Sequence, residues 1–144
     1  MAAIYRHTQV GYVTLGALGV AALGAAWSSI RTSSPIALGA ALLLGGLVMM
    51  FSTLTVVVDD ASLDVSFGPG LIRRRIPLGR IRAAREVRNR WYYGWGMRLT
   101  PAGWLWNVSG LGAVEVEFDD GHRFRIGSDE PGRLAEALQW RIRG

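Results

Sequence analysis

The sequence predicts an α+β membrane protein in which a transmembrane helical hairpin precedes an antiparallel β-roll or barrel with a C-terminal amphipathic helix. Three features predict this class. Residues 10–30 and 35–52 form two long uncharged apolar runs with a short polar link between them. Residues 53–127 contain short apolar alternations separated by turn residues, and residues 130–143 have the spacing of one amphipathic helix.

The charge distribution places a boundary near residue 53. Arg6 and Arg31 are the only charged residues before it, whereas all 11 acidic residues follow it. We therefore expect a tail and two-helix membrane part over residues 1–52 and one small domain over residues 53–144. The sequence contains no lysine and no cysteine, so its basic contacts are made chiefly by guanidinium groups and it forms no disulfide.

Each apolar run is long enough to cross a bilayer. As a helix rising about 1.5 Å per residue, each spans roughly 27 to 32 Å, close to the ~30 Å hydrocarbon thickness. Two alternatives remain open: the first run is a cleaved signal peptide, with small residues at positions 21–26, or the second is a buried core helix. The length of the first run and the short link to the second favour the hairpin.

Small side chains allow helices to approach closely in lipid, where no hydrophobic effect draws them together. Small residues recur every four positions on both runs, and we expect these stripes to face each other, although alanine and glycine are also simply common in such helices. The stripes are Ala17, Ala21 and Ala25 on the first helix, and Ala37, Ala41 and Gly45 on the second. Further glycines leave a face for a homo-oligomer contact.

Arginine counts set the expected orientation. Arg6 and Arg31 flank the first run and nearly balance, so the cluster that begins at Arg73 decides the topology. We expect a multi-pass protein of the cell membrane with both termini in the cytoplasm.

The domain begins with a predicted strand hairpin over residues 53–67, with a turn at residues 59–62. This register places Val58 opposite Leu63 and Val56 opposite Val65. In the next apolar stretch, Arg74 shares the apolar side, so it needs a sheet edge, a bulge or a partner carboxylate. A further strand is predicted over residues 81–88.

An aromatic loop over residues 89–96 and two strand pieces, residues 97–100 and 103–108, follow. Residues 113–127 predict a hairpin whose three-residue loop ends at Gly121. Its register pairs Val116 with Phe124, Val114 with Ile126, Glu117 with Arg123, and Glu115 with Arg125. The last helix is expected to be capped by Ser128 or Asp129 and to bury a stripe of Leu134, Ala137, Leu138 and Ile142.

The segment GLIRRRIPLGRI, preceded by the alternating hairpin and Gly68, resembles the signature of bacterial membrane-anchored pleckstrin-homology-like (PH-like) domains. The later stretch WYYGWGMRLTPAGWLWNVSGLGAVEVEFDDGHRFRIGSDEP resembles small membrane proteins of this type. The likeness covers roughly residues 53–142. It implies six or seven strands and one C-terminal helix, often after two transmembrane helices, and a role in binding or assembly. It implies no catalytic residues.

Two groups of residues are candidates for binding lipid or a partner. The first is the arginine cluster Arg73, Arg74, Arg75, Arg80 and Arg82, which suits anionic headgroups near the membrane. Alternatively, these arginines form a solvated face of the sheet or make salt bridges between subunits to Asp119, Asp120, Asp129 and Glu130. The second group is Trp91, Tyr92 and Trp95, which suit an interface or plug the open end of the roll. For Trp104 and Trp106 we expect a place in the core or in that plug.

We find no catalytic or metal-binding constellation in the sequence and expect no cofactor and no enzyme activity. The expected function is a membrane-anchored adaptor or regulatory protein that binds a membrane or cytoplasmic protein, the anionic inner leaflet, or both. The alternative is an accessory subunit of a membrane transport or envelope complex, assembled through its transmembrane helices. The acidic second half argues against nucleic acid as a partner.

Overall fold

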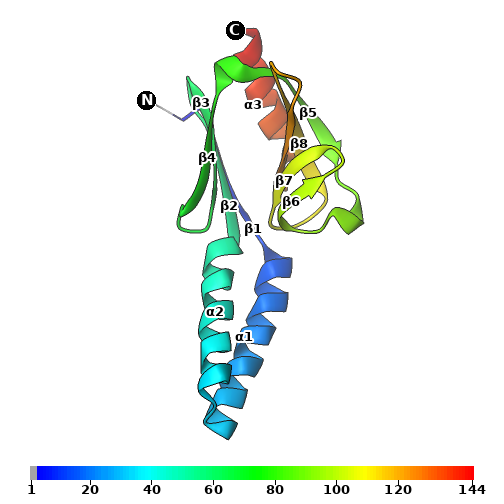
Figure 1. The fold of residues 1–144 in the computed structure, drawn as a ribbon. Coiled ribbons are helices and arrows are strands. Elements are labelled where there is room, and N and C mark those ends of the chain that lie inside the picture. The colour runs from blue at the N-terminus through cyan, green and yellow to red at the C-terminus, as the bar shows by residue number, and fades with distance from the viewer. Residues whose placement is uncertain (1–2) are drawn as a thin grey trace.

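A computed structural model describes residues 3–144 and shows an α+β protein (Figure 1). Two apolar helices extend away from a pair of β-sheets, and a third helix ends the chain. The helices are α1 (Tyr12–Thr32), α2 (Pro35–Phe51) and α3 (Pro131–Arg143). The strands are β1 (Tyr5–Val10), β2 (Thr53–Val58), β3 (Ser62–Phe67), β4 (Ile72–Pro77), β5 (Ile81–Arg88), β6 (Gly96–Thr100), β7 (Gly103–Asn107), β8 (Gly112–Phe118) and β9 (Arg123–Gly127).

The strands form two sheets that face each other. The first sheet has the order β1-β2-β3-β4 and is antiparallel throughout. The second has the order β5-β8-β9-β7-β6, and in it β7 runs parallel to β9. The prediction of a wholly antiparallel roll is therefore wrong for this one pair, because β9 inserts between β8 and the earlier hairpin β6–β7.

Both predicted hairpin registers are confirmed. Val58 lies opposite Leu63 and Val56 opposite Val65 in the first sheet. In the second sheet the four predicted pairs between β8 and β9 are all present. The β8–β9 turn ends at Gly121, whose φ of 87° is the left-handed conformation that glycine adopts without strain.

Strand β1 was not predicted, because residues 5–9 were assigned to a tail and Val10 to the first apolar run. It pairs along its whole length with β2, from Tyr5 opposite Val58 to Val10 opposite Thr53. Its sequence, YRHTQV, is polar on both faces and so lacks the apolar alternation that marks a strand. The pairing holds the segment before α1 against the segment after α2.

Helices α1 and α2 run side by side in opposite directions, joined through Ser33 and Ser34 (Figure 1). Neither contains a buried residue, and large apolar side chains such as those of Leu23 and Ile36 are 74% and 84% exposed. By length and composition α1 is sufficient to cross a membrane, whereas α2 is shorter. At Gly68, an added Cβ would lie 2.5 Å from the Met49 carbonyl oxygen, so the β3–β4 turn packs tightly on the end of α2.

The core lies between the two sheets and beneath α3. Within it Trp106 packs against Phe67 and, edge to face, against Phe124, with ring centroids 5.2 and 5.6 Å apart. Helix α3 contributes Leu134 and Leu138 as predicted and also Ala135, whereas Ala137 is only half-buried and Ile142 packs at the margin. The predicted cap is wrong: Glu130 occupies the N-cap without a side-chain cap bond, and Ser128 Oγ accepts instead from the Glu130 amide.

Candidate functional site

A cleft of about 550 Å³ opens between the two sheets. One wall is the edge strand β4, and the other includes residues of β6, β7 and the β8–β9 turn. Its charged lining residues are Arg74, Arg75, Arg80, Arg123 and Asp120, together with His122. The cleft therefore has an excess of positive charge.

Arg74 enters this cleft from the inward face of β4. Its guanidinium lies over the ring of Phe124, 4.5 Å from the centroid, and 5.8 Å from that of Phe118. Burial lowers the pKa of Arg74 below its ordinary value, and the nearby charge of Arg80 adds to the effect. Arg74 was predicted to need a sheet edge, a bulge or a partner carboxylate. It lies on an edge strand, and two aromatic rings beside its guanidinium take the place of a carboxylate.

The other three cleft arginines each have a carboxylate nearby. Among the described residues, Arg74 has no such partner and donates no hydrogen bond, so its N–H groups are available to a ligand. The pairs are Arg75 with Asp64, Arg80 with Asp120, and Arg123 with Glu115, at shortest N–O distances of 2.9, 3.6 and 3.8 Å. Arg74 is accordingly the uncompensated charge of the cleft.

The structure divides the predicted arginine cluster. Arg74, Arg75 and Arg80 line the cleft, whereas Arg73 and Arg82 are exposed outside it. Arg123 was assigned only as a cross-strand partner of Glu117, and its place in the cleft follows from the position of β9 beside β7. No sequence signal indicated that parallel contact.

Trp104 and Trp106 have different environments although they lie on the same face of β7. Trp106 is 8% exposed and belongs to the core, as expected. Trp104 is 48% exposed and lines the cleft, where the sheets diverge. It adds an aromatic surface beside the arginines, and exposed Leu99 adds an aliphatic one.

The register fixes the place of the cleft relative to the helices. Strand β2 leaves the end of α2 at Thr53 and reaches its far end at Val58, about 17 Å away at roughly 3.4 Å per residue. Pro77 pairs with Ser62 near that far end, and Arg80 follows it. Arg74 pairs with Val65, halfway along the sheet. The cleft therefore runs from the middle of the domain to the end away from α1 and α2.

The aromatic loop lies at the opposite end of the domain. Trp91 and Tyr92 are 75% and 58% exposed, and Trp95 is half-buried. Trp95 lines a groove with Val13 and Phe51, at the ends of α1 and α2 nearest the sheets. Figure 1 shows this loop and the β3–β4 turn on the side of the domain where the helices begin.

The predicted small-residue stripes are placed unevenly. Ala37, Ala41 and Gly45 are half-buried on α2. On α1, Ala25 is half-buried, but Ala17 and Ala21 are exposed. A Cβ added at Gly45 would meet nothing within 4 Å, so the contact between the helices does not require glycine there.

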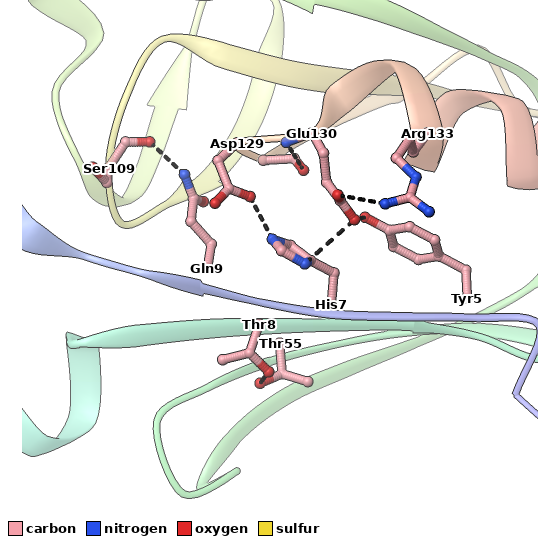
Figure 2. A network of polar contacts seen from close by, with 10 residues as sticks. Tyr5, His7, Thr8, Gln9, Thr55, Ser109, Asp129, Glu130 and Arg133 are labelled. Carbon is pink, nitrogen blue, oxygen red and sulfur yellow. Dashed lines mark hydrogen bonds and ion pairs between the residues drawn. The ribbon is translucent and has the colours of Figure 1, made fainter.

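A polar network holds β1 to the segment before α3 (Figure 2). Tyr5 donates a 2.8 Å hydrogen bond to Glu130, and His7 contacts both Asp129 and Glu130. Gln9 donates to the Ser109 carbonyl oxygen at 2.9 Å. These three residues alternate along one face of β1, so a strand that adjoins α1 is tied to the second sheet.

Glu115 is the most buried carboxylate of the described residues, with its side chain 1% exposed. It accepts hydrogen bonds from Arg85 and from Arg125, the latter at 2.9 Å, which confirms the predicted pair. Burial raises the pKa of Glu115, but the two arginines outweigh this and keep it below its ordinary value. The group is a structural ion cluster behind the cleft.

Comparisons of the chain with protein-family models, with curated proteins and with solved structures found no match.

Proposed function

We propose that this chain is a membrane-anchored binding protein whose cleft holds an acidic segment of another protein. The observation that carries the proposal is Arg74, a desolvated guanidinium without a carboxylate partner among the described residues. An unpaired charge that is partly withdrawn from water is unfavourable, and an anionic ligand would compensate it. The proposed activity is binding, without catalysis.

The membrane anchor is supported by the bare apolar surfaces of α1 and α2. At about 1.5 Å per residue α1 is roughly 32 Å long and α2 roughly 26 Å, near the ~30 Å of a hydrocarbon core. Because β1 pairs with β2, the segments before α1 and after α2 lie together. If α1 crosses the membrane, α2 must therefore return across it, which gives a transmembrane hairpin with both termini on one side. We assign that side to the cytoplasm from the arginine count.

The geometry favours a protein partner over the headgroups of the same membrane. Headgroups extend about 5 to 7 Å beyond the hydrocarbon, so Arg80 at the outer end of the cleft lies about 10 Å further out, where charges are screened because the Debye length is about 8 Å at physiological salt. Arg74, halfway along the sheet, lies only a few ångströms beyond the headgroups, so it is the position of the outer end of the cleft that favours a protein partner. Exposed Trp91 and Tyr92 lie at the helix end of the domain, where aromatic side chains suit the interface.

The PH-like assignment is also a proposal. Two facing sheets and one C-terminal helix agree with it. The five-stranded mixed sheet and the extra strand β1 from before the helices differ from the expected roll of six or seven strands.

Binding of labelled polyglutamate to the full chain in phosphatidylcholine nanodiscs tests the proposal. We expect salt-sensitive binding that Arg74→Met weakens by about tenfold or more, as loss of a charged hydrogen bond implies. Arg82→Met removes the same charge outside the cleft and is the matched control. Equal weakening by both variants would mean that only overall charge matters. Loss of binding when phosphatidylserine is added to the disc would mean that the cleft reaches the headgroups.

A second candidate function is assembly through the helices, as an accessory subunit or homo-oligomer. Gly16 and Gly24 are exposed on α1, and a Cβ added at either would meet nothing within 4 Å, so the chain's own helix pair leaves these positions open. Gly24→Leu should reduce the size of the assembly in mild detergent if another helix packs there. An unchanged size would remove this candidate.

A further inference from the structure

The cleft follows the edge of β4. Four consecutive residues of this strand line it: Arg74, Arg75, Ile76 and Pro77. One face of a strand carries only every second residue. Four consecutive lining residues therefore mean that the backbone edge of β4 borders the cleft. The acidic partner of this cleft can therefore reach main-chain groups as well as side chains.

That edge is open. β4 is the last strand of its sheet, with β3 as its neighbour on the other side. No hydrogen bond from elsewhere in residues 3–144 reaches the outer backbone of Ile72–Ile76. Open edges pair readily with other strands, and the arginines of β4 repel basic segments while they attract acidic ones.

We propose that the acidic segment binds in extended conformation along β4 and becomes the fifth strand of the first sheet. This inference rests on the proposed function and adds the mode of binding and the sequence class of the partner. Main-chain hydrogen bonds would supply affinity, and alternate side chains would supply specificity.

The inward residues of β4 define the partner's pattern. Arg74 and Ile76 face inward two residues apart, and the opposite wall offers Trp104 and Leu99. A paired strand places its own inward side chains at the same spacing. The partner should therefore carry an acidic residue opposite Arg74 and an apolar residue two positions away, opposite Ile76.

The palindromic peptide acetyl-TVTETVT-amide is a suitable probe, because its glutamate has a valine two residues away on each side. Either strand direction then presents the same pattern. We expect saturable binding to the full chain in phosphatidylcholine nanodiscs. Three changes should each weaken it by about tenfold or more: glutamine in place of the glutamate, N-methylation of two adjacent central residues, and Arg74→Met. Arg82→Met should have little effect.

Hydrogen exchange locates the added strand. At saturating peptide, exchange should slow in β4, while that of edge strand β6 should not change. Undiminished binding of the N-methylated peptide, slowed exchange in β6 instead of β4, or no binding of the peptide would each overturn the inference. In those cases Arg74-dependent binding of polyglutamate would leave the proposed function standing. If Arg74→Met affected neither probe, both proposals would fail.

Discussion

Arg74 lies over the aromatic ring of Phe124, with 4.5 Å between its guanidinium carbon and the ring centroid. The two residues belong to different sheets, because Arg74 is on β4 and Phe124 is on β9. The ring covers one face of the guanidinium, whereas its N–H groups remain without a protein acceptor in the described residues. This arrangement keeps a positive charge in the cleft without neutralising it.

Arg74→Met should leave the free energy of unfolding unchanged or raise it by up to about 1 kcal/mol. The cation–π contact contributes roughly 0.5 to 1 kcal/mol, but the substitution also removes a desolvated charge and its repulsion from Arg80. Arg75→Met is the contrast, because it breaks the bidentate contact with Asp64 and should lower stability slightly. Denaturant unfolding in detergent, followed by tryptophan fluorescence, measures both. A clear loss of stability in Arg74→Met would show that Arg74 serves the fold.

Glu115→Gln should lower the free energy of unfolding by about 2 to 3 kcal/mol. The substitution leaves Arg125 and Arg85 beside a buried neutral group, and the loss stays moderate because Arg85 is partly in water. The native pKa of Glu115 is lowered, so its contribution is present above the unfolded value of about 4.3 and is lost as the pH falls through the native value. Below about pH 4 the wild-type protein should therefore lose stability more steeply than Glu115→Gln. Parallel acid profiles would contradict this.

Tyr5→Phe should raise the pKa of Glu130 toward its ordinary value. The hydrogen bond from Tyr5 is the main cause that lowers this pKa, and the nearby His7 and Arg133 add to it. Loss of the bond should also cost about 1 kcal/mol of stability. Carbon-13 NMR titration of the glutamate carboxyl groups in the wild type and in Tyr5→Phe measures the shift. If Tyr5→Phe left the pKa of Glu130 unchanged, Tyr5 of β1 would not be bonded to Glu130 in solution.

Local patterns predicted the two hairpins β2–β3 and β8–β9. In each, the turn residues and both strand faces agree on one register, and all partners lie within a few residues of the turn. The sequence also indicated that Arg74 could not sit unaided on an apolar face. It gave no sign that the compensating ring would be Phe124, because that contact depends on how the two sheets meet.

Non-local pairing explains what the sequence did not predict. Strand β1 is separated from β2 by both apolar helices and has no apolar alternation of its own. Strands β7 and β9 are separated in the sequence by β8, so no local pattern predicts their parallel contact. This contact brings Arg123 and Trp104 to the cleft. The cleft is therefore a property of the assembled sheets, and only Arg74, Arg75 and Arg80 could be named beforehand.

The depth of three residues relative to a bilayer tests the central claim most directly. The chain has no cysteine, so Leu23→Cys, Trp91→Cys and Arg82→Cys each provide a single spin-label site in the full chain reconstituted in nanodiscs. Relaxation by lipid-soluble oxygen and by a water-soluble nickel complex reports the depth of each label. We expect Leu23 near the bilayer centre, Trp91 at the headgroup level, and Arg82 in water beyond it. The account would be contradicted if the nickel complex relaxed the label at Leu23 as strongly as the label at Arg82. It would also be contradicted if the label at Arg82 lay at headgroup depth.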